Sequence, residues 1–242
     1  MPGYVMHLAV AESIIKKCSI TDAGFVNDFL IGSIIPDIKK GNEKRKSHFW
    51  TEEEFKKFAR MPDIDLFMMK YADRVSEPFM FGYYSHLYMD HAFIEKYWNN
   101  HFTFYDKDMA ETNLYQQVAW VQSDASELVS RERFFSDELY YGDYNRMNEY
   151  MLRHYNIRIP ELRLAHMDDK LPDEIRTEEA EEPLRKMIDF LKRTHEQITP
   201  GPLTEDMVQS ALKVFHLREM EKLIEDTAGQ LSGRYNTICC DS

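Results

Sequence analysis

Apolar residues recur three and four positions apart along most of the chain, which is the spacing of an α-helix that buries one face. Segments that alternate in steps of two are few, and the sequence has only nine glycines and nine prolines. We therefore predict an all-α protein. Helices are expected over residues 4–17, 22–35, 78–98, 107–130, 143–155, 177–198 and 205–230, with a short one after Thr51.

Residues at the ends of these segments support the division. Asp22 and Thr51 have side chains that accept hydrogen bonds from the first turn of a helix, and Thr51 with Glu54 has the spacing of a capping box. Pro36 is expected to end the second helix, because proline lacks the amide hydrogen that a helix interior needs. Pro78 suits the first turn of the long helix that contains the segment GYYSHLYMDHAFIEKYW.

Composition limits the partners and the compartment. Of the 242 residues, 43% are hydrophobic, which is enough for a folded core, and the net charge is −12. A chain this acidic, without a basic face, is not expected to bind duplex nucleic acid. We see no signal peptide and no run of roughly 20 apolar residues that would cross a membrane. The three cysteines do not suggest a disulfide framework, so we expect a cytoplasmic protein.

The candidate chemistry begins with His86 and Asp90 in the long aromatic helix. Residues four apart share one face of a helix, so this pair can reach one cation, at the bond lengths of about 2.0–2.2 Å that zinc makes with imidazole and carboxylate. A zinc site needs at least one further protein ligand, and His7, Asp37 and His48 are the candidates. Spacing alone does not bring them together, and the alternative is an ordinary histidine–carboxylate hydrogen bond at a helix surface.

Four short segments carry a resemblance to a known family. These are MPGYVMH at the start, FLIGSIIPDI at 29–38, KSHFW at 46–50 and GYYSHLYMD at 82–90. In this order they resemble the zinc-dependent phospholipase C family and its relatives, the single-strand-specific zinc nucleases. The resemblance implies a multi-helical bundle with a cluster of up to three zinc ions, in which Asp90 bridges two metals. The ligands that it implies are His7, Asp37, His48, His86 and Asp90.

The rest of the family pattern is less complete in this chain. Secreted members use an N-terminal tryptophan as a ligand; here the amine of Pro2 would take its place if Met1 is removed. His101 and Asp124 are possible additional ligands, whereas His91 and Glu95 lie on a flank of the metal face. We therefore expect one or two zinc ions rather than three. The remaining histidines lack a partner at the family spacing and are expected to be ordinary surface or half-buried residues: His154, His166, His195 and His216.

A basic loop and several aromatic residues flank the candidate ligands. The loop KKGNEKRK has five basic side chains that either clamp a substrate phosphate or are simply solvated: Lys39, Lys40, Lys44, Arg45 and Lys46. The aromatic residues either wall a pocket or belong to the core: Phe49, Trp50, Tyr83, Tyr84 and Trp98.

The expected function is that of a zinc-dependent hydrolase of phosphate esters of the phospholipase C type, acting on a small phosphate ester or a lipid headgroup. Zinc lowers the pKa of bound water from 15.7 to about 7, and Asp37 is expected to be both ligand and acceptor of the water's proton. Two alternatives stay open. One is a non-catalytic cytoplasmic metal-binding helical module that acts in protein interaction, and the other is a helical scaffold without metal.

The acidic, weakly patterned stretch at 160–178 is the expected seam in the chain. Residues 1–160 would form the metal-binding helical hydrolase body. Residues 161–242 would form a C-terminal helical pair packed on this body, within one structural domain.

Overall fold

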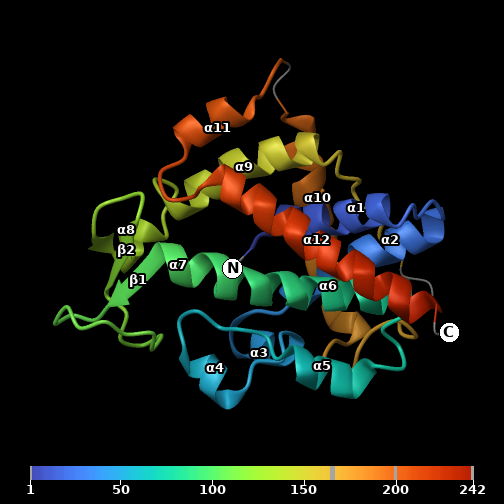
Figure 1. The fold of residues 1–242 in the computed structure, drawn as a ribbon. Coiled ribbons are helices and arrows are strands. Elements are labelled where there is room, and N and C mark those ends of the chain that lie inside the picture. The colour runs from blue at the N-terminus through green and yellow to red at the C-terminus, as the bar shows by residue number, and fades with distance from the viewer. Residues whose placement is uncertain (1, 164–166, 199–200, 241–242) are drawn as a thin grey trace.

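The chain folds mainly into α-helices, and a small three-stranded antiparallel sheet lies at one end (Figure 1). This computed structural model describes residues 2–163, 167–198 and 201–240. Within these ranges the buried apolar side chains form one continuous core. The all-α prediction is confirmed, with the sheet as a local exception.

The secondary structure elements follow one another along the chain. The helices are α1 (Tyr4–Lys17), α2 (Ala23–Gly32), α3 (Lys44–Ser47), α4 (Glu52–Lys56), α5 (Ile64–Tyr71), α6 (Pro78–Phe93), α7 (Asn99–His101), α8 (Arg131–Phe134), α9 (Tyr140–His154), α10 (Thr177–Glu196), α11 (Glu205–Ala211) and α12 (Leu217–Cys240). The 3-10 segments η1 (Ile35–Ile38) and η2 (Gly41–Glu43) follow α2, and the π-helical segment η3 (Ile94–Trp98) joins α6 to α7. The strands are β1 (Phe102–Tyr105), β2 (Trp120–Ser123) and β3 (Val129–Ser130), paired in that order.

The predicted helix starts are confirmed in atomic detail. The Asp22 side chain accepts a hydrogen bond from the Phe25 amide at 2.7 Å, and the Thr51 side chain accepts one from the Glu54 amide at 3.2 Å. Pro78 occupies the first turn of α6, where its missing amide hydrogen costs no hydrogen bond.

The second helix ends at Gly32, earlier than Pro36 predicts, and the chain continues as η1. At this end α2 packs very closely against α6. A Cβ atom on Gly32 would lie 2.0 Å from the carbonyl oxygen of Phe79, and one on Gly82 would lie 2.3 Å from that of Phe29. Only glycine permits two helix backbones to approach this closely.

This contact places the functional face of α6. His86 lies one turn after Gly82 and therefore faces the end of α2 and η1, where Asp37 lies. Helix α1 packs against both α6 and α12 (Figure 1). His7 of α1 therefore reaches the same region from the other side, with Nε2 3.5 Å from Asp90 Oδ1.

The predicted helix over 107–130 is wrong. Strands β2 and β3 occupy part of this segment, with Val121 and Ser123 buried while Trp120 and Gln122 are more exposed. This alternation in steps of two is the strand pattern, and four residues of it are easily missed in a long polar segment.

The predicted helix over 205–230 is interrupted between α11 and α12. One carboxylate oxygen of Asp143, Oδ2, accepts hydrogen bonds from the backbone amides of Lys213, Val214 and Phe215 at 2.8, 2.7 and 3.2 Å. In a continuous helix these amides would donate to carbonyl groups four residues earlier. The buried carboxylate replaces those partners and ends the helix. None of the described helices combines the length and the apolar character that a bilayer crossing requires.

Candidate metal centre

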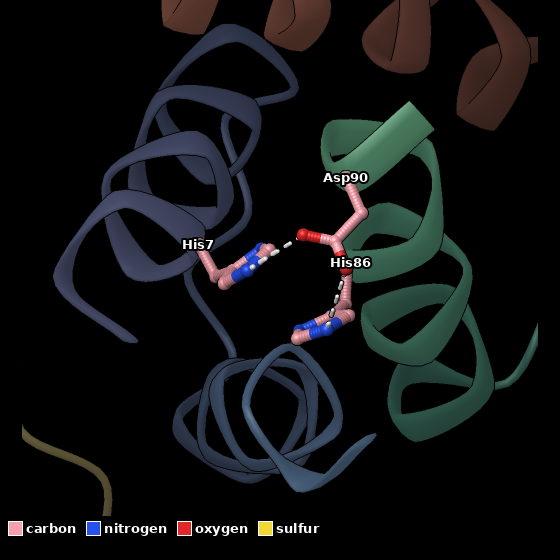
Figure 2. A group of neighbouring side chains, drawn as sticks. All are labelled: His7, His86 and Asp90. Atoms are coloured by element: carbon pink, nitrogen blue, oxygen red, sulfur yellow. Dashed lines mark ion pairs between the residues drawn. The ribbon is translucent and has the colours of Figure 1, made fainter. Parts of the chain in front are cut away.

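Five side chains from four chain segments meet at one buried point. His7 projects from α1, Asp37 from η1 and His48 from the end of α3, and α6 contributes His86 and Asp90. Figure 2 shows His7, His86 and Asp90 pointing toward one another from the facing helices α1 and α6. The convergence that spacing alone left open is therefore present in the structure.

Two groups of three donors have atoms that all lie within 4.8 Å of one another: Asp37–His48–His86 and His7–His86–Asp90. Nε2 of His48 lies 3.2 Å from Nε2 of His86. The same atom lies 3.3 Å from Oδ1 of Asp37 and 3.5 Å from Oδ2 of Asp90. Nε2 of His86 lies 4.0 Å and 3.7 Å from these two oxygens. Tetrahedral zinc with bonds of about 2.0–2.2 Å has ligand-to-ligand distances of about 3.3–3.6 Å, so these five distances fit a zinc site to within about 0.4 Å.

Hydrogen bonds behind the two imidazoles direct unprotonated nitrogens to the centre. Nδ1 of His86 lies 2.9 Å from the carbonyl oxygen of Ser33, which can only accept, so Nδ1 carries the proton. Nδ1 of His48 lies 3.0 Å from the Ser47 hydroxyl, which itself donates to the Pro36 carbonyl and therefore accepts from His48. In the neutral rings both Nε2 atoms then present lone pairs to each other. A cation between them would turn this repulsion into two bonds.

His7 and Asp90 carry buried polar atoms without a hydrogen-bond partner among the described residues. These are both ring nitrogens of His7 and both carboxylate oxygens of Asp90. Nε2 of His7 lies 3.5 Å from Oδ1 of Asp90, and the His7 ring stacks on His86 with the centroids 3.7 Å apart. Each unsatisfied buried group costs roughly 1–3 kcal/mol, and a bound cation would remove that cost.

Burial and charge set the protonation of the donors. Burial, with the Lys44 ammonium beside it, lowers the pKa of His48 to about 3, and burial also lowers the pKa of His7 well below its ordinary value. Burial raises the pKa of Asp90 to about 6. Burial acts in the same direction on Asp37, but Lys44 and the imidazoles outweigh it and hold the pKa of Asp37 well below its usual range. Near pH 7 these imidazoles are neutral and both carboxylates are ionised, as metal binding requires.

Asp37 and Lys44 form the border between the buried donors and a cavity. Lys44 Nζ lies 2.6 Å from Asp37 Oδ1, and their side chains are 24% and 8% exposed. The other four donors are at most 1% exposed. A cavity of about 510 Å³ opens at Asp37 and Lys44 and extends along Lys40 and the aromatic rings of Tyr4 and Tyr144. Sequence analysis did not identify Tyr4 of α1 or Tyr144 of α9 as cavity residues, because the pattern of neither helix directs its tyrosine to the site.

The basic loop divides into two parts. Three of its side chains pair with carboxylates away from the candidate ligands, namely Lys39 with Glu179, Arg45 with Glu52 and Lys46 with Glu43, whereas Lys44 pairs with the candidate ligand Asp37. Lys44 and Lys40 remain beside the cavity, as does the stem of Lys39. The loop is therefore partly a solvated segment and partly a positive wall next to the candidate ligands.

His101 and Asp124 do not join the central group. They contact each other and His216, at the junction of α7, β2 and α12. Asp124 follows a strand, whereas a helix was predicted there. Pro2 is buried and lines the cavity beside Asp37.

The other histidines and the aromatic residues have structural surroundings. His91 donates to the Pro62 carbonyl and, with Glu95, lines a different cavity. His154 and His195 are exposed, whereas His166 lies outside the described residues. The five aromatic residues that were candidates for a pocket wall are buried, which favours the core interpretation: Phe49, Trp50, Tyr83, Tyr84 and Trp98. Within this core the Tyr83 hydroxyl donates to the carbonyl oxygen of Ser47, next to His48.

Comparison of the sequence with protein-family models, and comparison of the chain with curated proteins and with solved structures, gave no match. The case for a metal centre therefore depends on the donor geometry and on the unsatisfied buried atoms.

Proposed function

We propose that this protein is a metal-dependent hydrolase of phosphate esters, with zinc as the cation and chemistry of the phospholipase C type. The observation that carries the proposal is the triad of donor atoms of Asp37, His48 and His86, together with the unsatisfied atoms of His7 and Asp90. Two imidazoles and one carboxylate are a donor set that zinc accepts.

The donors favour one ion, with a second in a less complete position. The two triads of the cluster, His7–His86–Asp90 and Asp37–His48–His86, share His86, whose single free nitrogen binds one ion at a time. The position next to Asp37 has Asp37, His48 and His86 as donors, which leaves a fourth coordination position for water. His7 and the outer oxygen of Asp90 would hold a second ion only with help from another ligand.

The cavity beside Asp37 supports a phosphate ester as substrate. Lys40 and Lys44 supply positive charge at its wall, and tyrosine rings supply apolar surface for the rest of a small substrate. This combination fits a small phosphodiester or a lipid headgroup.

The residues of the site have distinct roles in the proposed reaction. When bound, the cation supplies Lewis-acid activation of water and of the phosphoryl group. Asp37, held ionised by Lys44, accepts a hydrogen bond from the attacking water and orients it. Lys44 and Lys40 donate to the phosphoryl oxygens as negative charge develops there. The Ser33 carbonyl and the Ser47 hydroxyl fix the tautomers of His86 and His48.

A second candidate function is a structural metal site in a non-catalytic helical module that takes part in protein interaction. The observation that favours it is the burial of four of the five donors, because buried donors offer a substrate little access to the ion. Asp37, with its cavity, is the feature that argues for catalysis instead.

Metal content and turnover together separate these functions. We expect freshly purified protein to hold about one zinc ion per chain at this centre and to hydrolyse bis-(p-nitrophenyl) phosphate. His86→Ala and Asp90→Asn should each bind about one zinc ion per chain less than the unaltered protein and lose turnover, whereas the exposed matched controls His195→Ala and Asp189→Asn should keep both the ion and the turnover. Zinc without turnover would support the structural module. Folded protein that takes up no divalent ion would contradict both functions and leave a helical scaffold.

Two broader expectations belong to the same proposal. The body at 1–160 contains all five donors, and the segment 161–242 would cover them, with α10 reaching Lys39 through Glu179. The compartment would be the cytoplasm, because three cysteines without a disulfide framework suit a reducing environment. Fractionation of cells that express the protein tests the second point.

A further inference from the structure

A second group of metal-binding side chains lies outside the proposed catalytic centre. His101 at the end of α7, Asp124 just after β2 and His216 just before α12 bring their donor atoms within 4.8 Å of one another. Glu219, in the first turn of α12, contacts His101 from the far side. These residues, separated by up to 118 positions, are here called the junction group.

The junction group has the connectivity of a histidine–carboxylate metal site. Asp124 directs its two oxygens at two imidazoles: Oδ2 lies 2.6 Å from Nδ1 of His101, and Oδ1 lies 3.2 Å from Nε2 of His216. The other nitrogen of His101, Nε2, lies 2.8 Å from Oε2 of Glu219. A carboxylate on the far nitrogen is the usual outer partner of a metal-binding histidine, because it fixes the ring and its tautomer.

The backbone holds these side chains in place before any ligand binds. Strands β1 and β2 pair Phe102 with Ser123, so the adjoining residues His101 and Asp124 are neighbours, and the Asp124 amide donates to the His101 carbonyl at 3.2 Å. Tyr97 contacts both imidazole-bearing segments. Its hydroxyl accepts a hydrogen bond from the His216 amide at 2.9 Å, and its ring lies 4.3 Å from that of His101.

The junction group is separate from the central cluster. The helical run from α6 through η3 to α7 is unbroken, and His101 lies eleven residues after Asp90. At a rise of about 1.5 Å per residue the two are about 16 Å apart along the axis. No side chain belongs to both groups among the described residues.

We propose that the junction group is a second divalent-cation site, of the zinc class, with His101 Nδ1, Asp124 and His216 Nε2 as ligands and Glu219 as the outer partner of His101. Asp124 is 46% exposed and His216 is 32% exposed, so an ion can enter from solvent and complete its shell with water. To reach the roughly 3.3–3.6 Å of a tetrahedral shell, the His101–Asp124 contact of 2.6 Å must open by about 0.7–1.0 Å, and the His216–Asp124 contact of 3.2 Å by about 0.1–0.4 Å. The ion would join the sheet and α7 to the start of α12. This proposal does not depend on the proposed hydrolase function.

The competing interpretation is a chain of ion pairs without metal. In that case His101 carries two protons and donates to Asp124 and Glu219, and zinc has no effect on the group. Zinc binding to variants of these residues separates the two interpretations, since only the metal site links Asp124 and His216 to an added ion.

The test is equilibrium dialysis of chelator-treated full-length protein against Zn²⁺, with bound metal measured by elemental analysis. We expect Asp124→Asn and His216→Gln each to bind about one zinc ion per chain less than the unaltered protein. Glu127→Gln, which removes one exposed charge from the same loop, should bind as many ions as the unaltered protein. Glu219→Gln should keep the number of ions and weaken the affinity of one site by about 10–100-fold.

Each outcome decides the proposal. Asp124→Asn should bind fewer zinc ions per chain than Glu127→Gln whether or not the central cluster binds zinc. The test therefore stays valid if the hydrolase proposal fails. If Asp124→Asn and His216→Gln bind as many ions as Glu127→Gln, with equal affinity, the junction group is a chain of ion pairs. Circular dichroism checks that each variant is folded. If Asp124→Asn or His216→Gln fails to fold, the exposed variant Glu219→Gln provides the test, and an unchanged zinc affinity in that variant would contradict the proposed site.

Discussion

The central cluster and the junction group contain the same kinds of side chain in opposite surroundings. In the centre, the polar atoms of His7 and Asp90 are buried and have no hydrogen-bond partner within the described part of the chain, and imidazoles that present lone pairs surround Asp90. In the junction group, the Asp124 carboxylate receives a hydrogen bond on each oxygen and is 46% exposed. Without a cation, the unsatisfied donors of the centre lower the stability of the fold, and a bound cation would remove this cost. The donors of the junction group hydrogen-bond to one another and are therefore stable without a cation. Burial, rather than residue type, makes the difference.

The largest expected effect comes from the close contact between the backbones of α2 and α6, which positions the central cluster and not the junction group. Gly82→Ala places a Cβ 2.3 Å from the Phe29 carbonyl oxygen, which should force α6 away from α2 and lower the free energy of unfolding by about 3 kcal/mol or more. The control is Gly229→Ala in α12, where nothing lies within 4 Å of the added atom, and where alanine should stabilise the helix by about 0.5–1 kcal/mol. Urea unfolding at pH 7 measures both. Equal effects of the two substitutions would show that the helix crossing is looser than described.

The next effect is the pH dependence of metal binding at the centre. A cation needs Asp90 ionised, and the pKa of Asp90 in the metal-free protein is about 6. Below that pH a proton must leave before the ion binds, so affinity should fall about tenfold per pH unit, or about 100-fold from pH 6 to pH 4. The pKa of His48 is about 3, so His48 adds nothing in this range. Zinc titrations in the Asp124→Asn background isolate the central site; a constant affinity down to pH 4 would contradict the buried position of Asp90.

The two aspartates should affect the metal-free protein in opposite directions. Burial raises the pKa of Asp90 above its unfolded value, so the stability that its protonated form contributes is complete below pH 3.8 and is lost as pH rises through 6. For Asp124, burial is outweighed by hydrogen bonds from His101 and His216, which lower its pKa, so its contribution is present above pH 3.8 and lost as pH falls further.

Substitution of each aspartate tests this difference of sign. At pH 7, Asp90→Asn should stabilise the chelator-treated protein by about 2 kcal/mol, because the amide donates to the unprotonated nitrogens around it. Asp124→Asn should destabilise it by about 0.5 kcal/mol, as expected for an exposed ion pair. Thermal unfolding in the presence of chelator measures both changes. Two changes of the same sign would contradict the opposite contributions of Asp90 and Asp124 to stability.

The last expected effect concerns Lys44 and is smaller than that of Asp90→Asn. Its ammonium occupies one oxygen of Asp37, so Lys44→Met should free that oxygen and raise zinc affinity at the centre by about tenfold, or about 1.4 kcal/mol. Turnover of the phosphodiester should fall at the same time, because the substrate loses a positive partner. Lys46→Met is the matched control from the same loop, since Lys46 pairs with Glu43 at the surface. Weaker zinc binding in Lys44→Met would mean that the lysine supports the site instead of competing with the ion.

The sequence predicted the structure correctly where a periodic apolar pattern extends over several helical turns, and where a residue such as a capping aspartate or threonine has one typical structural role. Helix α1 and the caps at Asp22 and Thr51 follow from such local rules, and the five central donors were selected because four short segments stand in a familiar order. Interactions between residues far apart in the sequence could not be predicted from local patterns. The Asp143 carboxylate interrupts a helix 70 residues away, which no local pattern announces.

The junction group shows the same limit for a site. His216 was set aside because it lacks a carboxylate at the expected spacing, yet its partner Asp124 comes from a strand that the pattern concealed. One signal was available: His216 and Glu219 are three residues apart at the start of a helix and therefore share a face. Their meeting with His101 depends on strand pairing, which is a property of the fold.

Asp37 is the most exposed of the five central donors in the described part of the chain, and this position has a kinetic consequence. An ion can reach the four enclosed donors past Asp37 and Lys44, or during folding before α1 closes over α6. Release of the ion faces the same restriction. Loading and exchange at the centre should therefore be slow, over hours against a chelator, while the solvent-facing junction group equilibrates within the mixing time.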